Sequence, residues 1–380
     1  MEAYFDNAAT TAVFPEVREL MMKLMGEDYG NPSSLHGKGV QAEKYIKEAT
    51  AIISAQLKCK ERELVFTSGG TESNNLAIIG AALAHRRQGK HIISTTIEHA
   101  SVLATLEFLK KEGFEITLID VDSDGILKLD ELKAALREDT ILVSTMYVNN
   151  EIGSIQPIQE ISRIIKAHNP ECLYHVDAVQ AFGKLTFSPK KLGVDLMSIS
   201  GHKIHGPKGS GALYVREKVL LRPIIYGGGQ QNNMRSGTEN VPGIAGMGLA
   251  AKLIYTGIDE KMEYVKSLRD ALVGKLTGIE GVYSNTKEAP HIASISFTGV
   301  RSEVMLHALE DKGIYVSAGS ACSSNKPHVS SVLKSIGLEA DRLESTLRFS
   351  FCETNTMEEV DYAVEVINEL LPMLRRYVRH

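Results

Sequence analysis

Short apolar runs alternate with longer segments whose apolar residues recur every three to four positions, over about the first 255 residues. The runs are rich in β-branched residues and lie at 63–67, 91–96, 115–120, 140–147, 172–177 and 195–200. Each of them predicts a buried strand. The segment 40–57 is an example of the other pattern, with a one-sided apolar stripe that predicts an amphipathic helix. This alternation predicts an α/β fold with a mostly parallel sheet covered by helices on both faces.

The pattern changes after about residue 255. A long charged helix is predicted near 259–276, followed by strands near 291–297 and 347–351. Thr356-Met-Glu-Glu359 has the spacing of a capping box and predicts the start of a closing helix. We expect this part of the chain to form a smaller α/β domain.

Composition and charge narrow the possible classes of protein. The chain has 380 residues, 43% hydrophobic and 23% charged, which is typical of globular proteins and unlike disordered or collagen-like chains. The net charge of −5 argues against a protein that neutralises nucleic-acid phosphates. Four widely spaced cysteines and an acidic N-terminus without a long apolar run indicate neither a disulfide framework nor a secretory signal or membrane span. We therefore expect a cytoplasmic protein.

Glycines follow the first predicted strand. Ser68-Gly-Gly-Thr-Glu72 stands between that strand and a helix predicted near 73–83. Glycines let backbone N–H groups approach an oxyanion, and the helix N-terminus adds its positive dipole end. The segment is therefore either a phosphate site or an ordinary capped turn. It is not a Walker motif, because no Gly-Lys-Ser/Thr follows.

Polar residues follow the other predicted strands as well. The candidates are His99, Asn149, Asn150, Glu151, Asp177, Gln180, Ser200, His202, Lys203 and His205. Each of them alone is compatible with a structural role, such as a helix cap or a hydrogen-bonded core histidine. Ligands bind beyond the carboxyl ends of the strands in an open parallel sheet, so we expect these side chains to meet in one crevice.

This set of residues favours pyridoxal 5'-phosphate (PLP) as cofactor. Lys203 lies in a glycine-rich segment and can supply an amine for Schiff-base formation. Asp177, at the end of a strand, can keep a pyridinium nitrogen protonated. The alternative is a metal site made of His99, Asp177, His202 and His205. We expect no metal there, because Lys203 stands between two of these histidines and no compact His-x-x-x-His pattern occurs.

From about residue 4 to about residue 370 the chain resembles the cysteine desulfurases. The matching motifs are Tyr4-Phe-Asp-Asn-Ala-Ala-Thr-Thr11, Gly30-Asn-Pro-Ser-Ser34, Thr67-Ser-Gly-Gly-Thr-Glu-Ser73, Glu98-His99, Val148-Asn-Asn-Glu-Ile-Gly153, His175-Val-Asp-Ala-Val-Gln180, Ser200-Gly-His-Lys203, Arg235-Ser-Gly-Thr238 and Gly319-Ser-Ala-Cys322. These enzymes belong to the class V aminotransferase group and share the fold type I architecture of PLP enzymes, normally as homodimers. The resemblance implies a mixed, mostly parallel seven-stranded sheet in a large domain over 13–255, with residues 1–12 and 256–380 forming the smaller domain.

The resemblance also implies a role for individual residues. Lys203 would bind PLP covalently, and His99 would stack on the ring and help to move protons. Asp177 would pair with the pyridine nitrogen, and Gln180 with the phenolic oxygen. The phosphate group would be bound by Gly70, Thr71, Ser200 and His202, with Thr238 reaching it from the partner subunit. Asn150 would contact the cofactor and the substrate, and Arg348 would bind the substrate carboxylate as a bidentate partner.

Cys322 would be the nucleophile that takes sulfur from L-cysteine as a persulfide, releasing L-alanine. It lies in 318–325, a segment of small and polar residues with too little apolar bulk to bury a thiol. We expect structural roles for Cys59, Cys172 and Cys352. The persulfide would pass to an acceptor protein for iron–sulfur cluster assembly or for tRNA or cofactor thiolation.

Three alternative functions remain open at this stage. A class V transaminase would not need Cys322, and a selenocysteine lyase would use almost every one of the same residues. A scaffold without strong catalysis would only recruit partners. The presence of Lys203, Asp177, His99 and Cys322 argues against a scaffold.

Overall fold

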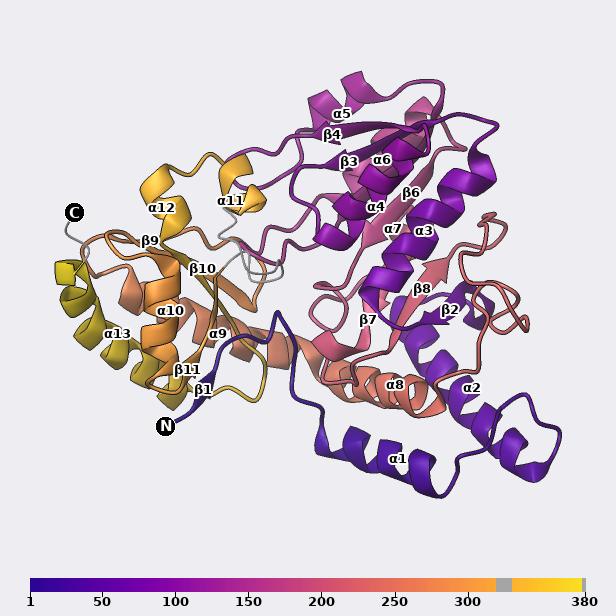
Figure 1. Ribbon diagram of the computed structural model, residues 1–380, viewed down its shortest axis with the longest axis horizontal. Helices are drawn as coiled ribbons and strands as arrows, with labels where there is room; N and C mark the ends of the chain where they lie inside the picture. Colours follow the sequence, from indigo (N-terminus) through magenta and orange to yellow (C-terminus); the bar gives the residue numbers. More distant parts are fainter. Residues whose placement is uncertain (319–329, 378–380) are drawn as a thin grey trace.

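A seven-stranded sheet forms the centre of the computed structural model, which describes residues 1–318 and 330–377 (Figure 1). In spatial order its strands are β2 (Leu64–Thr67), β8 (Gly211–Val215), β7 (Leu196–Ser200), β6 (Leu173–Asp177), β5 (Thr140–Met146), β3 (His91–Thr95) and β4 (Glu115–Ile119). All neighbouring pairs are parallel except those of β8, which runs antiparallel to β2 and β7. The prediction of a mixed, mostly parallel sheet is confirmed. The apolar pattern had not predicted β8.

Helices cover both faces of this sheet. Its helical elements are α1 (Pro15–Gly26), α2 (Gly37–Leu57), η1 (Glu61–Glu63), α3 (Gly70–His85), α4 (Ala100–Lys111), α5 (Leu129–Ala135), α6 (Ile158–His168), α7 (Pro189–Leu192), η2 (Gly201–Lys203) and α8 (Val241–Tyr255). Adjacent strand residues point to opposite faces, so Leu142 packs into the core under α3 and α4, and Val143 into the core under α2, α6 and α8. This arrangement explains why the strands are apolar throughout and do not alternate.

The apolar stripe predicted at 40–57 lies on α2 and packs against α8. Small residues allow the two helices to approach closely, since a Cβ atom on Gly248 would lie 2.6 Å from the Cβ atom of Ala49. Helix α2 ends at Leu57. The next residue, Lys58, caps the helix, because its φ of 54° places it in the left-handed region.

A second apolar core lies beside the large sheet (Figure 1). It surrounds a four-stranded antiparallel sheet in the order β12 (Ser317–Ala318), β13 (Thr346–Ser350), β10 (Ile292–Phe297) and β9 (Val282–Ser284). The accompanying helices are α9 (Ile258–Leu276), α10 (Ser302–Glu310), α11 (Ser331–Ser335), α12 (Ala340–Glu344) and α13 (Met357–Tyr377). The chain start joins this core, because β1 (Ala3–Tyr4) pairs with β11 (Ile314–Tyr315) and Phe5 is buried there.

The closing helix begins as predicted. Thr356 Oγ1 accepts the backbone N–H of Glu359 at 3.2 Å, and a Glu359 carboxylate oxygen accepts the N–H of Thr356 at 2.9 Å. These two bonds form the capping box at the start of α13.

Among the described residues no single helix is long and apolar enough to cross a membrane. Helices α8 and α9 reach that length and composition only together, and the chain bends by 77° between them.

Candidate active site

The polar residues that follow the strands of the large sheet meet around one cavity of about 290 Å³. Its walls are formed by Ala8, Ala9, Gly70, Thr71, Asn74, His99, Ser101, Met146, Val148, Asn150, Asp177, Val179, Gln180, His202, Lys203 and Arg348. Most predicted site residues are in this set. The carboxyl ends of β3, β5, β6 and β7 lie at the same edge of the sheet, so residues far apart in sequence converge there.

Lys203 is held at the cavity by the start of the chain. It closes η2, the single turn that directly follows β7. Its ammonium donates to the backbone carbonyl oxygens of Ala8 at 2.5 Å and Ala9 at 2.7 Å. The side chain is half-buried, so the amine is fixed in position at the cavity wall.

The segment after β2 has the features of an oxyanion site. Helix α3 begins at Gly70, three residues earlier than predicted, and its N-cap Gly69 offers no side-chain cap for the first N–H groups. Gly69 has a φ of 153°, which favours glycine. A Cβ atom on Gly70 would lie 2.7 Å from a methyl carbon of Val179, so a larger residue would not fit there.

Ser200 and His202 lie next to this segment. The hydroxyl of Ser200 is buried and has no hydrogen-bond partner among the described residues. It would lie 3.9 Å from a Cβ atom on Gly69. Burial and the nearby charges of Lys203 and Lys208 lower the pKa of His202 to about 4, so its imidazole is neutral near pH 7. A buried hydroxyl without a partner and a neutral imidazole N–H both suit an anionic ligand.

Thr238 does not line this cavity and is exposed. Its segment is nonetheless tied to the start of α3, because Arg235 forms an ion pair with Glu72 at 2.8 Å. A role for Thr238 in the cavity of its own chain is therefore not supported by the geometry.

A hydrogen-bonded chain runs from Asp177 to His99 along the cavity wall. Asn74 donates to an Asp177 carboxylate oxygen at 2.7 Å and to the Ser101 hydroxyl at 2.9 Å. The Ser101 hydroxyl lies 2.8 Å from His99 Nδ1, which also accepts the Ser101 backbone N–H at 3.1 Å. Because Nδ1 is an acceptor, the neutral imidazole carries its proton on Nε2.

Asn74 and Ser101 were not predicted from the sequence. Their signal is weak, since Asn74 lies within the first turns of a helix and Ser101 two residues beyond His99. The signal that could have identified Asn74 is a polar residue on the helix face that is otherwise mostly apolar and that the structure shows to be buried.

Arg348 closes the cavity from the other side. It lies on β13 of the four-stranded sheet and donates to the backbone carbonyl of Asn150 and to the Asp6 carboxylate, both at 2.8 Å. Its side chain is only 7% exposed. Gln180 is held by the Ala8 carbonyl at 2.9 Å and lies 3.3 Å from His291. The site thus combines residues from both sheets.

The cysteines behave differently from one another. Burial raises the pKa of Cys59 and of Cys172 to about 12, which makes both thiols unreactive near neutral pH. Burial also acts on Cys352, but hydrogen bonding to His205 lowers the pKa of its thiol. Cys322, the predicted nucleophile, lies outside the described residues.

The four residues considered for a metal site do not come together. His99, Asp177 and His202 line the cavity, whereas His205 does not and instead contacts Glu353. The quartet considered from the sequence therefore does not form a metal site, and the residues at the start of α3 suit an anionic group.

Comparisons with known proteins identify the family of this chain. The family model for class V aminotransferases matches residues 3–363. A cysteine desulfurase IscS from Dictyoglomus turgidum is 44% identical over 378 residues, covering 98% of this chain and 95% of the relative. A solved NifS-like protein is 41% identical, with a TM-score of 0.93 over 98% of this chain and all of that chain. The solved structure of SspA in complex with cysteine is 33% identical, with a TM-score of 0.80, and covers 93% of this chain and all of that chain.

The family model spans most of the chain, and the relatives are similar to it over nearly their full length. These matches show that the chain and its relatives belong to one sequence family. The cavity at the edge of the large sheet is lined by residues from several of these motifs, among them His99, Asp177 and Lys203. The chain therefore belongs to the class V aminotransferase family and, within it, to the cysteine desulfurases of the IscS and NifS type.

Proposed function

We propose that this protein is a PLP-dependent cysteine desulfurase that converts L-cysteine into L-alanine and carries the sulfur on Cys322. The observation that carries the proposal is the convergence of Lys203, Asp177 and the start of α3 on one cavity. These are an amine, a carboxylate and an oxyanion site, which together match the three chemical features of PLP. The substrate is supported by the relatives, one of which was solved in complex with cysteine.

The residues present fit this cofactor. The first N–H groups of α3 at Gly70 and Thr71, the unpartnered Ser200 hydroxyl and the neutral His202 would hold the phosphate group. Asp177, itself held by Asn74, would pair with the ring nitrogen, and Gln180 would contact the phenolic oxygen. When bound, PLP supplies an electron sink for the carbanion formed at the substrate α-carbon.

Lys203 has two tasks in this proposal. Its amine would bind the cofactor covalently, and the Ala8 and Ala9 carbonyls hold that amine at the cavity wall. When not bound to the cofactor, the same amine would be positioned to move a proton at the substrate α-carbon.

His99 and Arg348 act on the substrate. His99 holds a proton on Nε2 because Ser101 occupies Nδ1, so it can donate that proton on the cavity side. The Arg348 guanidinium is fixed by Asp6 and the Asn150 carbonyl, and its planar donors suit the substrate carboxylate. Arg348 thus orients the amino acid, and His99 helps to move protons.

The Cys322 thiolate then attacks the sulfur of the substrate. The S–S bond of a persulfide forms, the Cβ–Sγ bond of the substrate breaks, and its electron pair remains on Cβ. A proton added to Cβ completes the methyl group of alanine. The persulfide sulfur passes to an acceptor protein with a thiol, for iron–sulfur cluster assembly or for thiolation of tRNA or cofactors.

Further parts of the proposal concern assembly and location. We infer a homodimer in which Thr238 of each chain reaches the phosphate of the other, which is supported by its exposed position outside the cavity of its own chain. The two sheets and their separate cores support a large domain over 13–255 and a smaller one from 1–12 and 256–380. A cytoplasmic location is supported by the unpaired state of the three described cysteines, Cys59, Cys172 and Cys352.

The test maps sulfur after the holoenzyme has reacted with L-cysteine. Peptide mass spectrometry should find one added sulfur atom on Cys322 in the wild type and in Cys172→Ser, the matched control. Cys322→Ser should bind PLP with an unchanged visible spectrum, gain no sulfur and release no alanine. Continued alanine release by Cys322→Ser, or a persulfide on another cysteine, would refute the assignment.

A further inference from the structure

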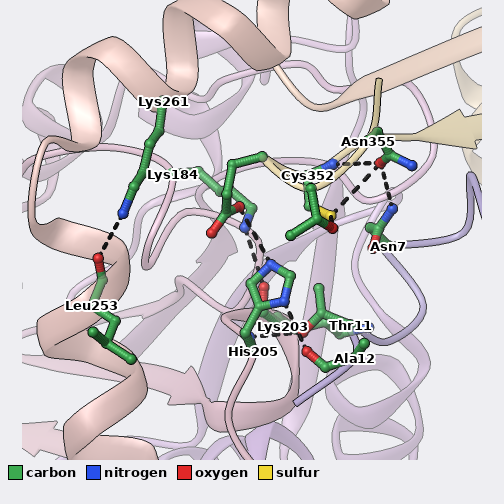
Figure 2. Close-up of polar contacts among 12 residues, drawn as sticks. Asn7, Thr11, Ala12, Lys184, Lys203, His205, Leu253, Lys261, Cys352 and Asn355 are labelled. Atoms are coloured by element: carbon green, nitrogen blue, oxygen red, sulfur yellow. Dashed lines mark hydrogen bonds and ion pairs between the residues drawn. The ribbon is translucent and has the colours of Figure 1, made fainter. Parts of the chain in front are cut away.

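A second cluster of titratable side chains lies on the other side of the Lys203 segment. It combines His205, two residues after Lys203, with Cys352 and Glu353, which directly follow β13. His205 is 2% exposed at its side chain and Glu353 is 12% exposed. Figure 2 shows the imidazole of His205 facing the sulfur of Cys352, with the backbone of Lys203 beside them. The proposed desulfurase reaction uses none of these three side chains.

The three side chains are close enough to share one ion. Their possible ligand atoms, the imidazole nitrogen, the sulfur and a carboxylate oxygen, all lie within 4.8 Å of one another. His205 Nε2 is 3.3 Å from a Glu353 oxygen. Ligand atoms around a tetrahedral zinc ion are about 3 to 4 Å apart, so movements of roughly 1 Å would complete the set.

Several of these buried atoms have no hydrogen-bond partner. Within the part of the chain that the structure describes, neither His205 Nε2 nor either carboxylate oxygen of Glu353 makes a hydrogen bond. The distance between them meets the criterion of an ion pair but lacks hydrogen-bond geometry. Buried polar atoms are normally satisfied, so an unsatisfied set that converges on one point indicates a missing ligand.

The orientation of His205 is fixed in the way usual for metal-binding histidines. Its Nδ1–H donates to the backbone carbonyl of Ala12 at 2.8 Å, which leaves Nε2 directed at Glu353, and a zinc ion bound there would replace the proton on Nε2. The ring of Phe14 stacks on the imidazole with 4.3 Å between ring centroids. The backbone N–H of His205 is held by the Thr11 hydroxyl at 2.7 Å.

The sulfur of Cys352 has two polar neighbours besides His205. The hydroxyl of Thr354 lies 3.1 Å from its sulfur, within hydrogen-bond reach. The side-chain oxygen of Asn355 accepts the S–H of Cys352 at 3.6 Å, and zinc binding would replace this proton. Thiolate is the form that binds metals.

The cluster borders a separate cavity of about 410 Å³, lined in part by His205, Cys352, Thr354 and Lys208. This cavity gives room for a water molecule as fourth ligand and a path for an ion. The charges are compatible with a divalent cation, because one thiolate and one carboxylate neutralise it. The buried Lys184 also interacts with Glu353 and Cys352, and its ammonium donates to the Lys203 carbonyl at 3.2 Å.

We propose that His205, Cys352 and Glu353 bind one zinc ion, with water completing a tetrahedron. One sulfur, one nitrogen and one oxygen ligand suit zinc, whereas calcium and magnesium require sets of oxygen ligands. The bound ion joins the segment after Lys203 to the segment after β13, which bears Arg348. It therefore fastens the two sheets together behind the catalytic cavity and stabilises the folded chain.

The test measures zinc binding to the PLP-loaded Cys322→Ser protein, so that the other reactive thiol does not contribute. After removal of metals, zinc is titrated against a chromophoric chelator, and bound zinc is counted after gel filtration. We expect one zinc per chain. Cys352→Ser, Glu353→Gln and His205→Gln should each weaken binding more than about 10-fold, and Cys172→Ser should leave it unchanged.

Two further readouts keep the test independent of folding and of activity. Cobalt in place of zinc should give a thiolate-to-metal absorption band in the near ultraviolet that Cys352→Ser lacks. Saturating zinc should raise the unfolding temperature of the parent protein, but not of Glu353→Gln, whose folding is checked by circular dichroism. Absence of bound zinc, or zinc that persists in any of the three ligand variants, would overturn the proposal and leave His205 and Glu353 as a buried ion pair.

Discussion

Two polar clusters flank the turn at Gly201–Lys203, and they are built on different principles. In the catalytic cavity, side chains from four strand ends and from β13 surround an open space of about 290 Å³. In the second cluster, His205, Cys352 and Glu353 face one another within 4.8 Å. The positive φ of His205, 62°, turns the chain so that Lys203 and His205 belong to different clusters although one residue separates them.

The pKa values of two buried glutamates express the same contrast. Glu98 lies behind the catalytic cavity, where burial raises its pKa to about 8 despite hydrogen bonds from Thr95 and the Met146 N–H. Burial acts in the same direction on Glu353, but pairing with His205 lowers its pKa to about 2. A buried carboxyl group is thus neutral near one cluster and charged in the other, depending on whether a cation faces it.

The largest expected effect is the loss of alanine release on substitution of Lys203, which belongs to the catalytic cavity and not to the second cluster. Lys203→Ala removes the amine that binds the cofactor and moves protons, so alanine release from L-cysteine should fall by about 10³-fold or more. Glu2→Ala, which alters an exposed side chain on the wall of the second cavity, should stay close to wild type. Equal losses in the two variants would contradict the separation of the clusters.

The second effect concerns the ion pair of Glu353. Its carboxylate stabilises the fold above pH 4.5 and loses that effect as the pH falls towards 2. Contacts with Cys352 and Glu353 outweigh burial and raise the pKa of His205 to about 9, so its contribution is complete below pH 6.5 and disappears as the pH rises through 9. In metal-free buffer, Glu353→Gln should therefore lower the free energy of unfolding by roughly 3 kcal/mol at pH 5.5. Denaturant titrations should find a smaller loss at pH 9.5, and a loss independent of pH would contradict the pairing.

Glu98→Gln should raise the free energy of unfolding, whereas Glu353→Gln lowers it. Because the folded-state pKa of Glu98 is raised from 4.5 to about 8, the folded protein holds a proton that the unfolded chain releases, and stability falls as the pH rises from 4.5 to 8. Glutamine mimics the protonated acid without this cost. The variant should be more stable than wild type by about 2 kcal/mol at pH 6, by more at pH 8, and similar to it at pH 4.5. Destabilisation at pH 8 would show that Glu98 is ionised in the folded protein.

The smallest effect tests the hydrogen-bonded chain in the catalytic cavity. Asn74→Ala leaves one Asp177 oxygen and the Ser101 hydroxyl without their donor, at a cost of about 1.5 kcal/mol, or roughly tenfold in kcat. We also expect a shifted pH profile and weaker PLP binding, which loss of packing alone would not produce. Asn75→Ala, next to it on α3 with a bond only to the Thr71 carbonyl, is the matched control.

The sequence predicted the catalytic cavity better than the second cluster, for a physical reason. Apolar runs identify strands, and parallel strands bring their carboxyl ends to one edge, so His99, Asp177 and Lys203 could be expected to meet. Strand β8 was not predicted because five residues after a glycine-rich segment carry little periodic signal. Asn74 and Ser101 act through other side chains, and no strand-end rule points to them.

Nothing in the local sequence connects His205 with Cys352. Their contact depends on how the four-stranded sheet packs beside the turn after β7, and that packing is a property of the whole fold. For this reason the sequence suggested only a structural role for Cys352. The metal quartet that we considered from the sequence, and did not expect to bind a metal, contained His205 together with three residues that line a different cavity.

The most direct measurement of the central claim is the yield of alanine and sulfide from L-cysteine. The PLP-loaded protein, with a thiol reductant present, should release the two products in equal amounts, and Lys203→Ala should release neither. Without the reductant, alanine formation should stop after about one equivalent per chain, because the sulfur remains on the protein. A PLP-loaded protein that forms no alanine from L-cysteine would contradict the account.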